Sequence, residues 1–183
     1  MLGNGTPQII TGNATKKVVN GDLFVLELTG KSEPDEAFAT TTIATSAITG
    51  NNGALSHSHG LGVGDINGDG LADVAFGSGG GFTDPENPKD SYQFYSGGGW
   101  YEQHLIDGIR SWTLHPIDSL IATSQIHVLD INGDSKADLI GGSAHNAGLF
   151  WFDQGENEQW KAHLIDASYT QLHASAMADL DGD

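Results

Sequence analysis

The sequence contains no cysteine and few basic residues. The lack of cysteine excludes disulfide bonds, although it does not identify the cellular compartment. Lysine and arginine together number 7 against 24 aspartates and glutamates, which gives a net charge of −17, and Arg110 is the single arginine. So few cations are a poor basis for binding a phosphate backbone, and the composition therefore argues against nucleic acid as a partner.

Long apolar runs and helical periodicity are also absent. No run approaches the roughly 20 apolar residues of a membrane span, and any secretion signal is expected to lie outside this sequence. No helical period is sustained over a helix length. Proline is scarce at 5 residues, whereas glycine is abundant at 26. Short apolar runs between glycine-rich turns predict an all-β chain, and a length of 183 residues predicts one domain.

An acidic motif occurs twice in full, at 65–73 and 130–138, and begins a third time at 179–183. Oxygen-bearing side chains stand at its first, third, fifth and ninth positions, and a main-chain carbonyl at the seventh would add another donor. Calcium takes six to eight oxygen ligands, so this spacing predicts a calcium-binding loop. The predicted ligands are Asp65, Asn67, Asp69, Leu71 (carbonyl) and Asp73, then Asp130, Asn132, Asp134, Lys136 (carbonyl) and Asp138, and finally Asp179, Asp181 and Asp183.

The motif could also be a solvated turn or an EF-hand loop. Asp, Asn and Gly are ordinary turn residues, but two full copies in the same register favour calcium over simple solvated turns. An EF-hand would need a bidentate Glu at position 12, where Phe76 and Gly141 stand. Gly70 at the sixth position permits the sharp turn, and Ser135 is expected to do so less well.

Strand-length runs recur in the same order around each acidic motif. One run precedes the loop, a short apolar run follows it, an aromatic-rich run ends in an acid, and a fourth run opens with an aromatic. A repeated four-stranded unit is the blade of a β-propeller. The chain is thus predicted to be a single propeller segment over 1–183 with about three blades. The predicted blade strands cover 6–43, 57–117 and 124–165, and a lone first strand covers 171–179.

The phase of the repeat leaves two interpretations open. The first blade lacks its first strand, and the 171–179 strand has no blade of its own. The chain is then either a fragment of a larger propeller or half of a six-blade ring, in which two copies self-associate and each lends its last strand to the other.

The acidic loops, each followed by a short apolar strand, resemble FG-GAP/VCBS-type repeats, the calcium-binding blades also found in the integrin alpha-chain head. Four further segments resemble a bacterial subgroup of extracellular propellers: residues 59–65, 124–127, 143–146 and 160–165. The resemblance implies a propeller with structural calcium and an extracellular, periplasmic or cell-surface setting. The first blade departs from the pattern, because Asn4 and Gln8 stand where acids are expected at positions 5 and 9.

Histidines and tryptophans are the remaining candidates for chemistry. His59, His127 and His173 lie on predicted first strands, which line the channel of a propeller, and are candidate catalytic or metal-binding residues. The alternative is that each fills a polar channel wall. Candidate ligand-binding residues are His145, Trp100 and Trp151. Tryptophans at repeated strand positions otherwise pack between blades.

The sequence therefore predicts a calcium-stabilised extracellular propeller that acts as a binding or scaffold module for a glycan or a protein. One alternative is a propeller-type polysaccharide lyase or sugar dehydratase, with a channel histidine as general base. The small number of lysines and arginines argues against this alternative, because few basic side chains would be present to bind an acidic substrate. Another alternative is a structural subunit of a surface assembly. Fold alone does not choose among these functions.

Overall fold

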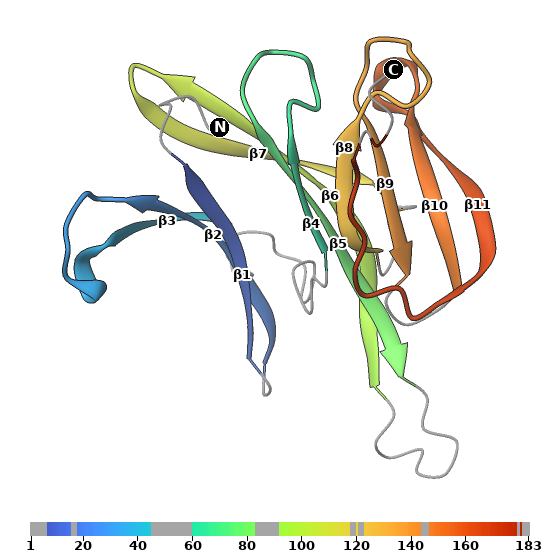
Figure 1. Ribbon diagram of the computed structural model, residues 1–183, viewed down its shortest axis with the longest axis horizontal. Helices are drawn as coiled ribbons and strands as arrows, with labels where there is room; N and C mark the ends of the chain where they lie inside the picture. The colour runs from blue at the N-terminus through green and yellow to red at the C-terminus, as the bar shows by residue number, and fades with distance from the viewer. Residues whose placement is uncertain are drawn as a thin grey trace.

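The computed structural model describes residues 7–15, 18–44, 60–82, 92–117, 120, 123–143, 147–178 and 180. Within them the chain is nearly all β, which confirms the predicted fold class, and the strands form three antiparallel sheets that lie side by side (Figure 1). No helix in these ranges is long and apolar enough to cross a membrane. The candidate residues His59, His145, Asp179, Asp181 and Asp183 lie outside the described residues.

Each sheet is a meander of strands that follow one another in the sequence. The first sheet consists of β1 (Gln8–Thr15), β2 (Val18–Leu28) and β3 (Phe38–Ala44), with the 3-10 turn η1 (Pro34–Glu36) before β3. The second consists of β4 (Gly60–Gly64), β5 (Asp73–Phe82), β6 (Tyr92–Ile106) and β7 (Ile109–Ile117). The third consists of β8 (Thr123–Leu129), β9 (Asp138–Ser143), β10 (Ala147–Gln154) and β11 (Trp160–Thr170), with the turn η3 (Glu156–Glu158) before β11.

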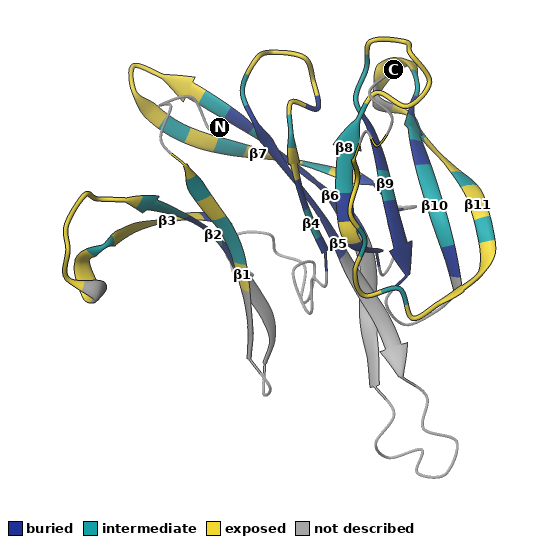
Figure 2. Cartoon of the chain, in the orientation of Figure 1, coloured by how far each residue is buried: buried dark blue, intermediate teal, exposed yellow. Residues whose placement is uncertain are grey.

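The second sheet is buried on both faces because the other two sheets cover it. Val74, Ala75 and Phe76 are consecutive in β5, and none is more than 2% exposed. Since neighbouring side chains of a strand point to opposite faces, this run can be buried only if both faces are covered. Val74 and Phe76 join the core against the first sheet, and Ala75 joins the core against the third. Burial is deepest where the sheets face one another, whereas β3 and β11 are mostly exposed (Figure 2).

The innermost strands of the second and third sheets approach each other closely, with glycines of β4 packed against β8. Gly62 and Gly64 of β4 face Ile126 and Val128 of β8. A Cβ atom on Gly62 would lie 2.7 Å from the Ile126 carbonyl oxygen, and one on Gly64 would lie 2.6 Å from Val128 Cγ1. Both separations are shorter than van der Waals contact, so glycine allows the blades to converge at this edge.

One predicted strand is absent. The sequence pattern predicted a strand over 171–179, but residues 172–178 are in no strand. The first sheet has three strands, and the described residues include no strand before β1. A β-strand requires a ladder partner for its N–H and C=O groups, and the part of the chain that the structure describes offers none to this segment.

The close approach of β4 to β8 yields a stability prediction. Gly62→Leu should lower the free energy of unfolding by at least about 2 kcal/mol, because the new side chain would overlap the β8 backbone. The control is Val63→Leu on the same strand, where the native side chain is 48% exposed, and which should change stability by less than about 0.5 kcal/mol. Urea unfolding followed by tryptophan fluorescence measures both, and equal effects would contradict the packing described.

Candidate functional site

The first acidic loop, between β4 and β5, is held by its own carboxylates. Asp65 Oδ1 accepts hydrogen bonds from the Gly68 and Asp69 N–H groups at 2.8 and 3.0 Å, and Asp65 Oδ2 accepts one from the Gly70 N–H at 2.9 Å. Asn67 Oδ1 accepts from the Asp69 N–H at 3.1 Å. Gly68 and Gly70 have φ of 79° and 87°, the left-handed region that favours glycine. The loop is thus wound around its first aspartate.

The second acidic loop, between β8 and β9, repeats these bonds atom for atom. Asp130 Oδ1 accepts from the Gly133 and Asp134 N–H groups at 2.7 and 3.2 Å, and Asp130 Oδ2 accepts from Ser135 at 2.8 Å. Asn132 Oδ1 accepts from Asp134 at 2.9 Å. Ser135 adopts a φ of 70°, a left-handed conformation without glycine, which is the strain expected from a serine at the sixth position.

The fifth position also matches between the loops. Asp69 Oδ1 accepts from the Leu71 N–H at 2.8 Å, and Asp134 Oδ1 accepts from the Lys136 N–H at 2.9 Å. The carboxylates at positions one and five are exposed in both loops, so their free lone pairs face solvent.

The ninth aspartate of each loop is buried and ties three segments together. Asp73 is 0% exposed; its Oδ2 accepts from the Ile66 N–H at 2.8 Å and its Oδ1 from the Gln103 N–H in β6 at 2.9 Å. Asp138 is also 0% exposed and accepts from Ile131 at 3.1 Å and from Gln154 in β10 at 2.9 Å. Each carboxylate thus joins the start of its loop to the second and third strands of its sheet.

Burial affects the ionisation of the first of these carboxyls. Desolvation is the largest cause and raises the pKa of Asp73 above its ordinary value of 3.8. The N–H groups of Gln103 and Ile66 act in the opposite direction, and the charge of Asp69 adds to the rise in pKa. A cation near the loop would favour the ionised form.

The third position connects each loop to the outer strands through an acid and a histidine. Asn67 Nδ2 donates to Glu102 Oε1 at 3.1 Å, and Glu102 Oε2 lies 2.7 Å from His115 Nε2. In the third sheet Asn132 Nδ2 donates to Asp153 Oδ1 at 3.3 Å, and Asp153 Oδ2 lies 3.5 Å from His163 Nε2. Sequence analysis missed this network. The sequence does contain a sign of it, because an acid and a histidine recur at equivalent positions of the two repeats.

The histidines of the network stack on the tryptophans that were predicted to bind ligand. Trp100 and His115 have ring centroids 4.3 Å apart, and Trp151 and His163 have centroids 4.6 Å apart. Trp100 is 1% exposed within the core, so its prediction as a ligand-binding residue is corrected: its ring faces are covered and cannot stack on a sugar. Trp151 is half-buried, with one face against His163.

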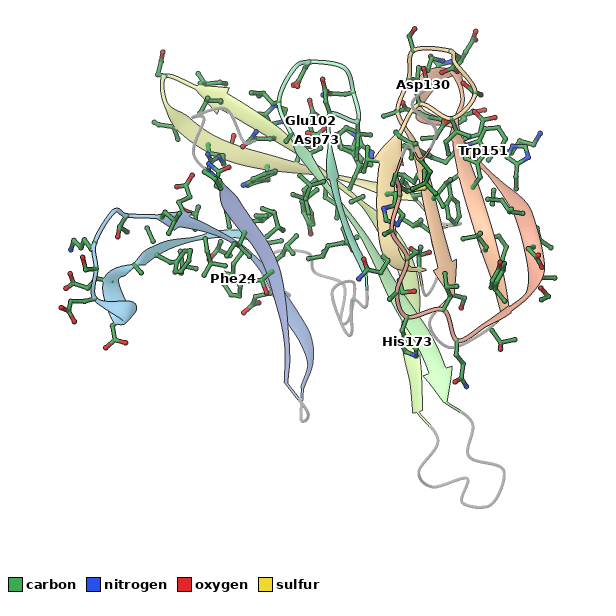
Figure 3. The ribbon with its side chains drawn as sticks, viewed as in Figure 1. Phe24, Asp73, Glu102, Asp130, Trp151 and His173 are labelled. Atoms are coloured by element: carbon green, nitrogen blue, oxygen red, sulfur yellow. The ribbon has the colours of Figure 1, made fainter. Side chains whose placement is uncertain are left out.

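The candidate channel histidines do not assemble into a metal site among the described residues. His127 Nε2 lies 2.9 Å from Ser175 Oγ, a contact between β8 and the segment that follows β11. His173 lies at the end of the third sheet opposite to Asp130 (Figure 3). In the described ranges, no three His, Asp or Glu side chains are placed to share a metal ion.

The oxygen donors of the loops suit a hard cation, although only two carboxylates of each loop remain on the exposed side. A carboxylate offers about four lone-pair positions. Asp65 uses three for the loop bonds and Asp69 uses one, so both retain capacity. The Asn67 amide and the Leu71 carbonyl would complete an all-oxygen set of the kind calcium prefers.

The two loops lie at the same edge of neighbouring sheets and are joined by a buried glutamine. With its amide nitrogen turned toward two carbonyl oxygens, Gln154 donates to Ile66 O in the first loop and to Ala137 O in the second, each at 3.2 Å. A shallow depression between the loops is lined by Asp65 and Asn67 on one side and by Lys136 on the other. In Figure 3, Asp73 and Glu102 lie at this edge of the second sheet, and Asp130 lies at the same edge of the third.

Comparison with known families agrees with the repeated geometry. The family described as FG-GAP repeat matches residues 59–95, which include the first loop, and the family described as FG-GAP-like repeat matches residues 130–183, which begin at the second loop. No curated protein and no solved structure matches the chain significantly. Each match includes one acidic loop and overlaps one of the two four-stranded sheets. Together they identify the chain as an FG-GAP-type repeat protein, built from blades of a β-propeller-like binding module.

Proposed function

We propose that this chain is a calcium-stabilised, extracellular propeller module that binds a glycan or a protein along the edge formed by its acidic loops. The observation that supports it best is the repetition of one hydrogen-bond pattern in both loops. In each, backbone N–H groups hold the first, third and fifth side chains so that their remaining oxygens stay on the exposed side. Oxygen donors held in place before binding favour a cation.

Calcium suits these loops better than magnesium does. Magnesium demands near-ideal octahedral geometry, whereas calcium accepts six to eight oxygens in flexible arrangements, including backbone carbonyls and waters. A net charge of −17 would be partly neutralised by each bound ion. Because Asp65 and Asp130 are exposed, the expected affinity is that of extracellular modules, which bind calcium at roughly 0.1–1 mM. An affinity in this range would be consistent with the proposed extracellular setting and with the proposed VCBS-like character of the repeats.

The loop edge is the proposed place of ligand contact. The exposed carboxylate of Asp65 and the lysine Lys136 line the depression between the loops, and a calcium ion at this edge would offer coordination positions for hydroxyl or carboxylate oxygens of a ligand. The residues there would contribute both charge signs, with Asp65 and Lys136 on opposite sides. Glycan hydroxyls and polar protein loops both match this chemistry.

Removal of calcium should lower the unfolding temperature of the chain by several degrees. Calcium at 100 times its Kd stabilises by about 2.7 kcal/mol per site, which corresponds to roughly 5–10 °C for a chain of this size. Asp130→Ala should lose the calcium response of one loop. In EDTA its cost should be smaller than that of Asp138→Ala, because the three N–H groups that lose their acceptor are in an exposed loop and can bond to water. Asp138→Ala should lower stability by about 2 kcal/mol or more even in EDTA, because two N–H groups lose their acceptor.

These variants separate a metal-binding loop from a purely structural one. Differential scanning calorimetry of the wild type and both variants, with calcium and with EDTA, provides the comparison. If EDTA leaves the wild-type unfolding temperature unchanged, the loops are turns without a cation and the calcium proposal fails.

Ligand binding at the loop edge should require both calcium and the lysine in the depression. A glycan array probed with the labelled chain should show signals in millimolar calcium that vanish in EDTA. Lys136→Glu should weaken these signals by about tenfold, since it reverses a charge between the loops. Lys161→Glu, an exposed position on β11, is the matched control and should bind as the wild type does. Absence of any calcium-dependent signal would exclude a glycan ligand.

In calcium-free buffer, the stability contributed by Asp73 should fall as the pH rises. The raised pKa means that the folded state holds this proton more tightly than the unfolded state, so the contribution is full below about pH 4 and is lost as the pH passes the folded pKa. Asp73→Asn does not titrate, and the wild-type unfolding free energy measured in urea should therefore decline relative to this variant as the pH rises above about pH 4. Saturating calcium should reduce the decline. A difference that rises with pH would show that Asp73 is instead better stabilised when ionised.

A further inference from the structure

A buried side chain connects the two acidic loops. Gln154 of β10 is 6% exposed, and its amide nitrogen donates to Ile66 O in the first loop and to Ala137 O in the second, each at 3.2 Å. A side-chain amide nitrogen carries two hydrogens, so these two bonds use its whole donor capacity. We call this pair of hydrogen bonds the Gln154 bridge.

The Gln154 bridge reaches the backbone between predicted cation ligands of each loop. Ile66 stands between the first and third positions of the first loop, and Ala137 stands between the seventh and ninth positions of the second. A cation that fixes the ligands on either side of one of these residues also fixes the carbonyl oxygen to which Gln154 donates. The bridge is therefore sensitive to the order of both loops.

Further hydrogen bonds extend the bridge to the buried aspartate of each loop. The Ile66 N–H donates to Asp73 Oδ2 at 2.8 Å, and the Gln154 N–H donates to Asp138 Oδ1 at 2.9 Å. The side chain of Ile66 is 1% exposed and lies in one core with Phe152 of the third sheet. The first loop is thus held to the third sheet by apolar packing as well as by the bridge, and a continuous path joins the ninth ligands of the two loops.

The two loops share the cost of ordering this bridge. A glutamine loses rotamer freedom when its side chain is fixed, and the loop backbone loses freedom as well. Once a cation has fixed one loop, one of the two carbonyl acceptors of Gln154 is already in place. The other loop then closes on an amide that is already ordered, so its cation meets a smaller ordering cost. That is the condition for positive cooperativity.

We propose that Gln154 couples the two acidic loops, so that a calcium ion in one loop raises the affinity of the other loop for calcium. The inference rests on the proposed calcium binding and adds a regulation to it: the loop edge fills over a narrower range of calcium concentration than two independent loops would. Repulsion between the two ions acts in the opposite sense. It does not require Gln154, so removal of the amide isolates the bridge.

A calcium titration of isotope-labelled chains followed by NMR measures this coupling. The amides of Gly68 and Gly133, which donate to the first aspartate of each loop, report the two loops separately. Asp69→Asn and Asp134→Asn each disable one loop by removing a charge, and each keeps the side-chain oxygen that accepts from the N–H two residues on. The coupling ratio is the product of both stepwise association constants of the two-loop chain, divided by the product of the two single-loop constants.

Gln154→Met should lower the coupling ratio about fivefold, because methionine has a similar length but cannot donate to a carbonyl. Gln103→Met is the matched control, since the Gln103 N–H donates to Asp73 as the Gln154 N–H does to Asp138. Among the described residues the Gln103 side chain makes no hydrogen bond to either loop, so the ratio should stay that of the wild type.

Two outcomes of the titration are distinct. An unchanged ratio in Gln154→Met, or an equal fall in Gln103→Met, would overturn this inference alone. Absence of calcium binding by the wild type would overturn the proposed function and this inference with it.

Amide hydrogen exchange in EDTA tests the bridge without a cation. Gln154→Met should speed exchange in residues 65–72 and 130–137 about fivefold, because both loops lose a hydrogen bond. The reference is the first sheet, which packs on the opposite face of the second sheet. Exchange that is unchanged in both loops would show that the amide does not hold them, and would overturn the proposal.

A last measurement leaves Gln154 in place, in case Gln154→Met does not fold. In Asp69→Asn the second loop alone binds calcium, and calcium should nevertheless slow exchange in residues 65–72 about fivefold through the bridge. The control carries Asp69→Asn and Asp134→Asn together, and calcium should slow exchange in neither of its loops. No slowing in the first loop of Asp69→Asn when its second loop is saturated, or equal slowing in the control, would overturn the coupling.

Discussion

The blades depend on one buried carboxylate each, Asp73 in the second sheet and Asp138 in the third. Both are 0% exposed, and each accepts one N–H from the start of its acidic loop and one from the third strand of its sheet. Burying a carboxylate is costly unless it is hydrogen-bonded, and these bonds offset part of the cost. The carboxylate thereby fixes the loop against the sheet, so that the exposed oxygens of Asp65 and Asp130 are presented in the same way in both blades.

The convergence of the inner strands is the second constraint. Gly62 and Gly64 permit the close approach of β4 to β8, and residues 172–178 contact β8 through His127 and Ser175. A blade is therefore a unit that repeats by stacking, with an apolar core shared between neighbours. In this arrangement His127 of the inner strand β8 contacts Ser175 of the next segment, and within the described residues it does not share a metal site with other side chains.

The features that the sequence predicted wrongly or did not predict have a common cause. Trp100 was a ligand-binding candidate because tryptophan often stacks on sugars, yet it is 1% exposed and stacks on His115. The predicted strand over 171–179 has the right sequence pattern but no ladder partner in the part of the chain that is described. The network from Asn67 through Glu102 to His115 was not anticipated. In all three cases the outcome depends on residues far away in the sequence.

The sequence by itself determined the all-β class, the order of strands in each blade, the places of the acidic loops and the FG-GAP resemblance, which the family matches confirm. These features depend on short-range spacing: alternation along a strand, and donors a few residues apart in one loop. Only the tertiary structure decided which side chains are covered and which atoms of the loops remain available. It showed that Asp73 faces inward while Asp65 faces solvent, because burial and cross-strand hydrogen bonds arise only when strands distant in sequence pair and neighbouring sheets pack.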